Sequence, residues 1–483
     1  MNREINKILI GLEIHITLKS KKKIFNWTET YNENIPPNSQ VSPWELGYLG
    51  TLPIINPECI ELAIKLSLVL QAKISPVIIF DRKIYHYYDL PKGYQITQYR
   101  QTLANSGYLP LITPSGKVTN IPLRNLQLEE DTAKSFYTNE SIELDFNRAG
   151  NPLIELVTEP IFHNSEETIL FLRQLQNLLR YLDISEAKME KGQLRVDLNF
   201  SLNLADDYQT PRYEVKNLNS FNAIEKVLKY EINKHQQLQK EKKLPLPSQT
   251  FGFDEKKQIT IPQREKTDYF YLPESNIPPI KISQKDIQRI AKKIPVLPWI
   301  KWEELTKNGA SPSKAKTITE KPILLKTINF LEKKEAFSSA KEYDNWITFY
   351  LNYLSSCFSE EIFFLFQKKW RSYWKLFQLW KEKKLDTEEI KSMVEQLITT
   401  KKPFSYLIKK YQKKEVDDYS FLFVELEKLW NLDLIEKYSL KPQKVQNFLL
   451  GQIKKKFPDL DIRKINEKVS EFIAKKIIPS TTT

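Results

Sequence analysis

Hydrophobic and polar residues alternate along the segment 7–17, where isoleucine or leucine occupies every even position from 8 to 16. A period of two is that of a β-strand, so Glu13 and His15 are expected to project from the same face of one strand. Similar alternation continues along the chain and predicts further strands. The predicted strands are 7–17, 121–129, 152–157, 194–202 and 212–216.

Helical periodicity predicts helices as well, and their order among the strands is irregular. This mixture favours an α+β fold over a strictly alternating, doubly wound sheet. The segment 244–283 is interrupted by prolines and is expected to be extended. The predicted helices of this part are 57–72, 165–182 and 220–241.

From about residue 284 onward the pattern is helical throughout, with many lysines and aromatic residues. Aromatic residues recur at helical spacing within 363–384, which is typical of a packed core rather than of a base-stacking surface. Further helices are expected at 417–430, 441–456 and 461–476. The predicted domains are therefore residues 1–283 (α+β), 284–400 (helical) and 401–483 (a helical tail).

Composition narrows the class of protein. The chain has 483 residues, 41% of them hydrophobic, and no apolar run approaches the ~20 residues that a membrane span needs. The first residues, MNREINK, lack the apolar stretch of a signal peptide. Cys59 and Cys357 lie far apart, so neither a disulfide framework nor a cysteine-based zinc site is expected. A soluble protein of a reducing compartment is predicted.

The formal net charge is +13, and the segment 401–483 contributes +7 of it, from 18 basic and 11 acidic residues. Such an excess suits a polyanionic partner such as RNA. A chain rich in lysine through compositional bias would show the same excess. Charge alone leaves both interpretations open.

Several common catalytic motifs are missing, among them the GxxxxGK[ST] phosphate loop, GxGxxG, HExxH and GxSxG. Instead, most of the predicted strands place carboxylates on their polar faces. In one sheet these faces would form a concavity lined by carboxylates, which favours binding of a hard cation such as Mg²⁺. Basic residues of the kind that contact phosphate oxygens lie nearby in the sequence, which together suggests phosphoryl transfer. They are Arg82, Lys83, Lys92, Arg148 and Arg195. Tyrosines within 80–98 are open to two interpretations, core or nucleotide stacking.

Several longer motifs resemble the GatB/GatE family, the B subunits of tRNA-dependent amidotransferases. They follow one another in the family's order and cover roughly residues 8–283, and NFLLGQIKKKF (447–457) is similar to the family's C-terminal tail. The motifs are GLEIH (11–15), FDRK (80–83), DLPKGYQITQ (89–98), LEED (128–131), NRAGNPLIE (147–155), EKGQLR (190–195) with D-x-N after it, and E-x-KNLNSF (214–221).

The resemblance implies an activity. Enzymes of this family convert Glu-tRNA(Gln), and often Asp-tRNA(Asn), to the amidated form. The B subunit phosphorylates the side-chain carboxylate with Mg-ATP, and ammonia that a separate amidase (glutaminase) chain releases from glutamine then displaces phosphate; a third, small chain completes the heterotrimer. The catalytic cradle of the B subunit is similar to glutamine synthetase. Misacylated tRNA is the implied partner, no membrane is, and the bacterial cytoplasm is the implied location, with an organelle matrix or stroma as the alternative.

The resemblance also implies roles for particular residues. The metal ligands it implies are Glu13, His15, Glu130, Glu155 and Asp197. The implied catalytic residues are Glu13, His15, Glu130, Lys83 and Lys92, and the implied ATP contacts are Arg82, Arg148, Arg195 and Tyr87.

One departure from the family concerns zinc. Many members carry two cysteine pairs after the first strand, where this chain has FNWTET (25–30) and VSPWELG (41–47), so zinc is not expected. Two other functions stand beside the enzyme hypothesis. One is a tRNA-binding scaffold without catalysis, against which intact Glu13, His15, Glu130 and Asp197 argue. The other is a stand-alone ligase that uses free ammonia; the lack of any amidase signature in this chain argues instead that glutaminase activity lies on a partner.

Overall fold

The computed structural model divides into two compact units, residues 1–347 and 348–483. It describes residues 5–477 except a small number of positions and short segments. These exceptions are residues 32, 139, 205–208, 242–247, 255–256, 258, 263–268, 308–309, 335, 401, 410–418, 432–433, 435–440, 458–459 and 461. The proline-rich 244–247 therefore lies outside the described residues.

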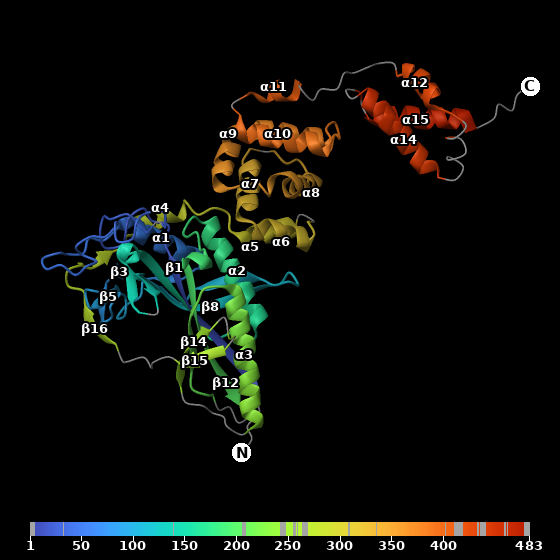
Figure 1. Ribbon diagram of the computed structural model, residues 1–483. Helices are drawn as coiled ribbons and strands as arrows, with labels where there is room; N and C mark the ends of the chain where they lie inside the picture. Colours follow the sequence, from blue (N-terminus) through green and yellow to red (C-terminus); the bar gives the residue numbers. More distant parts are fainter. Residues whose placement is uncertain are drawn as a thin grey trace, which may run out of the picture. The chain divides into compact units, whose positions relative to one another are not determined.

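A ten-stranded sheet organises the first unit, and β1 (Ile5–Thr17) runs through its middle (Figure 1). Its strand order is β15-β14-β13-β12-β1-β11-β8-β6-β2, with β7 paired to β8. All pairings are antiparallel except that of β13 with β14. The other strands are β2 (Lys73–Ile74), β6 (Ala104–Asn105), β7 (Tyr108–Ile112), β8 (Val118–Glu130), β11 (Pro152–Thr158), β12 (Leu194–Leu204), β13 (Tyr213–Leu218), β14 (Gln249–Asp254) and β15 (Ile259–Pro262).

One face of this sheet forms the core. Ile10, Ile14 and Ile16 are fully buried on it, and helices α2 (Ser165–Tyr181) and α3 (Phe221–Lys240) cover it (Figure 1). Each of these helices begins with a side-chain cap, Asn164 for α2 and Ser220 for α3, which satisfies an otherwise unpaired backbone N–H. The apolar half of the alternating pattern thus turns inward, and the polar half is left for the opposite face.

Smaller sheets and connecting elements surround the large sheet. A three-stranded sheet of order β16-β4-β5 carries Arg82 and Lys83, two of the predicted phosphate contacts, on β4. The remaining elements before residue 284 are α1 (Pro57–Val69), β3 (Val77–Ile78), β4 (Asp81–Ile84), β5 (Tyr94–Thr97), β9 (Lys134–Tyr137), β10 (Ile142–Asp145), η1 (Phe146–Arg148), η2 (Met189–Lys191), β16 (Phe270–Pro273) and β17 (Ile280–Lys281).

Helices follow for the rest of the chain, as the periodicity predicts. Those up to residue 347 belong to the same compact unit as the sheet, where Tyr181 of α2 donates a hydrogen bond to the carbonyl oxygen of Val296. They are α4 (Gln284–Ala291), α5 (Pro298–Lys307), α6 (Pro312–Glu320), α7 (Pro322–Glu332) and most of α8 (Ala340–Phe349). The boundaries of the three predicted domains remain a prediction.

The second unit contains the remaining helices. In α9, Phe366, Tyr373 and Phe377 are buried, which confirms the predicted core for these three residues, whereas Phe364 of the same helix is exposed. Helices α12, α14 and α15 share their own apolar cluster, built around Leu422 and Leu449. The bounds are η4 (Tyr350–Leu354), α9 (Glu360–Lys381), α10 (Thr387–Thr399), α11 (Phe404–Lys409), α12 (Phe421–Leu429), α14 (Pro442–Lys456) and α15 (Ile462–Ile477).

Candidate functional site

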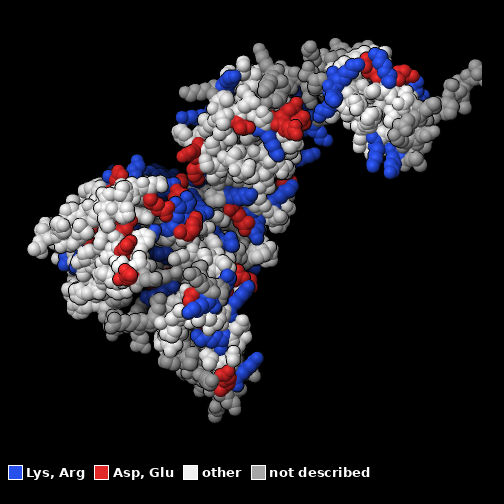
Figure 2. All heavy atoms as spheres, viewed as in Figure 1, with Lys and Arg blue, Asp and Glu red and all other residues white. Residues whose placement is uncertain are grey.

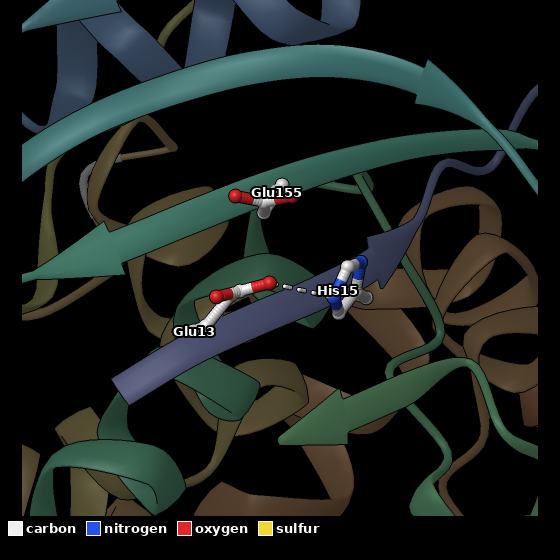
Figure 3. Close-up of side chains that lie close together, drawn as sticks. All are labelled: Glu13, His15 and Glu155. Atoms are coloured by element: carbon white, nitrogen blue, oxygen red, sulfur yellow. Dashed lines mark ion pairs between the residues drawn. The ribbon is translucent and has the colours of Figure 1, made fainter. Parts of the chain in front are cut away.

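The polar face of the large sheet gathers acidic side chains around one imidazole. In the β-ladder His15 of β1 stands opposite Glu155 of β11, and Glu13 stands opposite Asp197 of β12. Directly paired residues point to the same face, so the strand pairing brings together side chains that are far apart in sequence. One ligand atom each from Glu13, His15 and Glu155 lies within 4.8 Å of the others (Figure 3).

A further carboxylate orients the imidazole. Nδ1 of His15 donates a hydrogen bond of 2.9 Å to Oε1 of Glu129, while Nε2 lies 3.6 Å from Oε1 of Glu13. A carboxylate on one ring nitrogen fixes the tautomer and leaves the other nitrogen available to a metal ion. Glu129 therefore acts on the cluster through His15, with its own side chain almost completely buried.

Burial and like charge together give this cluster unusual protonation. Burial raises the pKa of Glu155 to about 8, and the nearby carboxylates of Glu129 and Glu13 add to the rise. Burial also raises the pKa of Asp197, although its Oδ1 accepts a hydrogen bond of 2.8 Å from the backbone N–H of Asn217. Burial alone would lower the pKa of His15, but hydrogen bonds to Glu129 and Glu13 raise it well above the usual range.

These properties fit a divalent cation. The charges of Glu129 and Glu13 raise the pKa of Glu155, so these carboxylates repel one another, and a bound cation would reduce that repulsion. Carboxylate oxygens are the ligands that Mg²⁺ and Mn²⁺ prefer. Glu13, His15 and Glu155 are the residues that would hold the ion, with Asp197 beside Glu13 in the ladder.

Glu130, predicted from the sequence as a metal ligand, lies apart from this cluster. Nζ of Lys92 is 2.6 Å and 2.7 Å from the two oxygens of Glu130, and the backbone N–H of Ile96 donates to Oε1 at 2.9 Å. Burial raises the pKa of Glu130, and the charge of Lys92 opposes that rise. Lys92 also lies over the ring of Trp44, with its side chain 4% exposed, so both partners of the pair are enclosed. Their predicted roles in catalysis remain predictions.

The predicted arginines are each engaged with an acidic group. Arg82 forms a two-pronged ion pair with buried Glu274, at 2.6 Å and 3.0 Å. Arg195 lies 3.0 Å and Arg148 3.7 Å from oxygens of Asp131. Burial would raise the pKa of Asp131, but the two guanidinium groups hold it below the usual range.

Lys83 and Tyr87, unlike the three arginines, are described by contacts with aromatic rings. Nζ of Lys83 lies 4.3 Å from the centre of the Tyr269 ring, and Lys83 is close enough for its charge to lower the pKa of Glu155 against the effect of burial. Tyr87 is exposed, and its ring packs on that of Tyr88 with 4.4 Å between centroids. Lys83 thus lies near the carboxylate cluster, and Tyr87 presents an aromatic surface to solvent.

A polar cavity of about 260 Å³ lies where β1 ends. Thr17, two residues beyond His15 and on the same face of the strand, forms part of its wall, as do Asp131 and Arg148. The cavity therefore places one of the predicted phosphate contacts, Arg148, near the end of the strand that carries Glu13 and His15.

Glu129 is a site residue that the sequence motifs alone did not single out. In LQLEED, Leu126 and Leu128 are fully buried in the core. Continuing that period of two places Gln127 and Glu129 on the opposite, polar face, and the ladder pairs Gln127 with Glu155. The alternation itself is therefore the signal that distinguishes Glu129 from Glu130.

A buried ion pair lies beside the two segments in which this chain lacks the family's cysteine pairs. Nζ of Lys23 lies 3.3 Å from Oε1 of Glu45, and Asn26 donates a hydrogen bond to the same carboxylate. Cys59 and Cys357 are both free thiols. That zinc is not bound remains a prediction.

Fold and site together define an α+β protein with a cluster of carboxylates around one imidazole on the polar face of its main sheet. Comparison with known sequences specifies the family. The profile of a family described as "GatB/GatE catalytic domain" matches residues 8–288, more than half of the chain. The chain belongs to this family.

Relatives match over much of their length. A protein of Thermosipho melanesiensis, named as the B subunit of an aspartyl/glutamyl-tRNA(Asn/Gln) amidotransferase, is 35% identical over 489 residues, covering 98% of this chain and 99% of the relative. The protein of the same name from Mycoplasmopsis agalactiae is 34% identical over 467 residues, covering 92% and 94%. That from Coprothermobacter proteolyticus is 46% identical over 288 residues, covering 57% and 59%.

Proposed function

We propose that this chain is the B subunit of a tRNA-dependent amidotransferase. In the proposed reaction ATP phosphorylates the side-chain carboxylate of Glu-tRNA(Gln), Asp-tRNA(Asn) or both. Ammonia then attacks the acyl phosphate and releases inorganic phosphate, which leaves the amide. The observation that carries this proposal is the cluster of Glu13, His15 and Glu155 on one sheet face, in a chain that belongs to the GatB/GatE family.

Mg²⁺ is the cation that we assign to the cluster. When bound, it would neutralise charge on the phosphate oxygens during transfer. The chain's own residues hold and orient these ligands. Glu129 retains the proton on Nδ1 of His15, so that Nε2 stays directed toward Glu13. Lys83, near Glu155, is the cation in the best position to contact a phosphate oxygen, while Lys92 and Arg82 are occupied by their own carboxylates.

The ammonia is proposed to come from a separate amidase (glutaminase) chain, with a third, small chain completing a heterotrimer. The names of the relatives, each of which denotes one subunit of an amidotransferase, support an assembly of several chains. Among the described residues, no helix is both long and apolar enough to cross a membrane. We propose the bacterial cytoplasm as the location, with an organelle matrix or stroma as the alternative.

The cradle that surrounds the cluster is proposed to resemble the catalytic core of glutamine synthetase, which activates glutamate in the same way. The segment 401–483 is proposed to contact tRNA. It contributes +7 of the net charge of +13, and phosphate contacts by lysine and arginine give affinity without reading sequence. Deleting it is expected to weaken tRNA binding and flatten its salt dependence, measured as binding curves at two salt concentrations.

Amidation driven by ammonium chloride tests the proposed reaction without the amidase activity. The chain, co-purified with its partner chains, would be assayed on misacylated Glu-tRNA(Gln) and Asp-tRNA(Asn) with ATP and Mg²⁺. We expect amide formation and stoichiometric release of phosphate with at least one of the two tRNAs. Binding of tRNA without any ATP-dependent product would favour the scaffold hypothesis instead.

A further inference from the structure

Lys216 of β13 lies beside the carboxylate cluster and has no part in the phosphate contact assigned to Lys83. It belongs to the motif E-x-KNLNSF, two residues beyond Glu214. On the face of the first unit that Figure 2 shows, lysine and arginine side chains are spread among acidic ones, so a lysine by itself does not indicate a site. What distinguishes Lys216 is the backbone that carries it and the groups that surround it.

An irregularity in the sheet holds this part of β13 against Asp197. The register with β12 shifts between residues 196 and 198, so that two residues of β13, Lys216 and Asn217, stand opposite the single residue Asp197. Such a β-bulge redirects side chains and is common beside active sites. Asn217 has a φ of 60°, in the left-handed region that asparagine tolerates. Its backbone N–H donates a hydrogen bond of 2.8 Å to Oδ1 of Asp197, so the bulge is fixed to the carboxylate beside Glu13.

The ammonium group of Lys216 lies near two carboxylates, and no described side chain holds it at hydrogen-bond distance. Nζ is 3.9 Å from Oε1 of Glu214, whose other oxygen accepts a hydrogen bond of 3.1 Å from the hydroxyl of Thr250. Burial raises the pKa of Asp197, and the charge of Lys216 is among those that oppose this rise. Because its side chain is 22% exposed, Lys216 is accessible to a ligand while it lies beside the cluster.

Lys216 and Lys83 flank the cluster on different strands. In the order β13-β12-β1-β11, Lys216 adjoins Asp197 of β12, whereas Lys83 is close enough to affect the pKa of Glu155 of β11. The three arginines and Lys92 are instead paired with carboxylates of their own. The polar face thus offers an ammonium group on each side of β1 that a ligand can contact.

We infer that Lys216 binds the ionised side-chain carboxylate of the aminoacyl group, and that it distinguishes this substrate from the neutral amide product. The inference rests on the proposed function, in which that carboxylate attacks the γ-phosphate of ATP. Two anions must then approach each other, and a cation beside each one reduces their repulsion. Lys83 is assigned to the phosphate, so Lys216 on the other side of β1 is the cation for the carboxylate. An ammonium group bonds more strongly to a carboxylate than to an uncharged amide, and substrate and product differ by this group alone.

Two tRNAs that differ only in this group provide the test. Glu-tRNA(Gln) and Gln-tRNA(Gln), with the amino acid attached through a linkage that resists hydrolysis, would be titrated into the complete amidotransferase complex with Mg²⁺ and a non-hydrolysable ATP analogue. Asp-tRNA(Asn) and Asn-tRNA(Asn) would be compared in the same way. We expect the unmodified enzyme to bind the acidic form more tightly, and Lys216→Met to lower that preference about tenfold, as the loss of a charged hydrogen bond does. The matched control is Lys229→Met, an exposed lysine of α3 paired with Glu225, which should keep the preference.

A second variant separates binding from folding. Lys216→Met leaves buried Glu214 with one cation fewer, whereas Lys216→Met with Glu214→Gln removes both charges. Both variants should lose the preference for the acidic form and show a lower kcat in ammonium-driven amidation, with KM for ATP within about twofold of the unmodified value. Glu214→Gln alone should keep the preference, because the ammonium group of Lys216 remains.

The outcomes separate this inference from the proposed function. A preference for the acidic form that survives in both Lys216 variants, with amidation by the unmodified complex intact, overturns the inference and leaves the proposed function standing. Equal binding of the two tRNAs by the unmodified enzyme also overturns it, as does a raised KM for ATP with the preference unchanged, which would assign Lys216 to the phosphate. Absence of ATP-dependent amidation in the unmodified complex overturns the proposed function itself.

Discussion

Two neighbouring glutamates on β8 meet opposite surroundings. Glu129 lies on the polar face of the sheet, among Glu13, Glu155 and one imidazole, where its charge and that of Glu13 raise the pKa of Glu155. Glu130 is buried in the other direction, against the ammonium group of Lys92. The same residue type, one position apart, thus lies in a crowded acidic cluster in one case and in a matched ion pair in the other.

The difference indicates which region is built for a ligand. Asp131, like Glu130, is neutralised by the chain itself, because Arg148 and Arg195 lie beside it. Glu155 is compensated only in part, by the charges of His15 and Lys83, and its raised pKa reports the cost of that arrangement. A protein keeps uncompensated acidic groups together at a cost to stability, which a bound cation offsets. We therefore assign function to the crowded cluster and a structural role to the matched pairs.

The largest expected effect comes from removing a ligand of the cluster. His15→Ala and Asp197→Asn should each lower ammonium-driven, ATP-dependent amidation by about a thousandfold, since several kcal/mol of charge stabilisation depend on the ion. Initial rates at saturating ATP measure this. Glu159→Gln is the matched control, because Glu159 is an exposed carboxylate paired with Arg124. Near-normal rates of amidation in both variants would show that the cluster takes no part in the reaction. Glutamine hydrolysis by the amidase chain should persist in both variants.

Breaking the matched pair should act on stability instead. Lys92→Met leaves Glu130 buried without its cation, which should lower the free energy of unfolding by roughly 3 kcal/mol. The double variant Lys92→Met with Glu130→Leu should recover most of that loss, because neither charge then remains. Urea unfolding followed by tryptophan fluorescence measures both. Equal losses in the free energy of unfolding of the single and the double variant would show that the cost does not come from leaving Glu130 without its cation.

Glu129 should show an intermediate effect through the imidazole. Glu129→Leu removes the acceptor for Nδ1 of His15 and should weaken the apparent Mg²⁺ affinity by about 10- to 100-fold. Glu129→Gln keeps a carbonyl acceptor and should lose less. Activity measured as a function of Mg²⁺ concentration distinguishes the two, since only the metal requirement should shift. A similar loss in both variants would point to a role of the negative charge rather than of orientation.

The smallest expected effect is on the melting temperature, and it comes from repulsion among the carboxylates of the cluster. In EDTA at a pH of about 9, where Glu155 is ionised despite its raised pKa, Glu155→Gln should raise the melting temperature by about 1–3 °C, because it removes one of the mutually repelling carboxylates. Added Mg²⁺ should stabilise the unmodified chain and have little effect on this variant, since binding to the folded state is what raises Tm. Differential scanning fluorimetry with and without Mg²⁺ measures both changes. A lower melting temperature in EDTA would mean that Glu155 is held by favourable contacts after all.

Local pattern allowed much of the fold to be predicted. All five predicted strands of the main sheet form within a few residues of their expected bounds, because one buried face imposes a period of two. The helices α1, α2 and α3 likewise form at the predicted positions, each capped by the residue before it. Both outcomes follow from short-range chemistry that the sequence displays directly.

The partners of buried charges could not be predicted in the same way. Lys92 and Glu130 are 38 residues apart, and Arg82 and Glu274 are 192 apart, so their pairing depends on how the small sheet packs against the large one. No periodicity reports such packing. The position of Glu129 in the cluster, in place of Glu130, could have been predicted. The alternation that buries Leu126 and Leu128 already places Glu129 on the opposite, polar face of the strand.

Direct measurement of cation binding tests the central claim. Mn²⁺, a paramagnetic substitute for Mg²⁺ with the same preference for carboxylate oxygens, would be titrated into the full chain and followed by electron paramagnetic resonance. We predict one site of high affinity in the unmodified protein and in Glu159→Gln, and its loss in His15→Ala and in Glu155→Gln. Unchanged Mn²⁺ binding in those two variants would contradict the claim, because the ion would then lie somewhere other than among Glu13, His15 and Glu155.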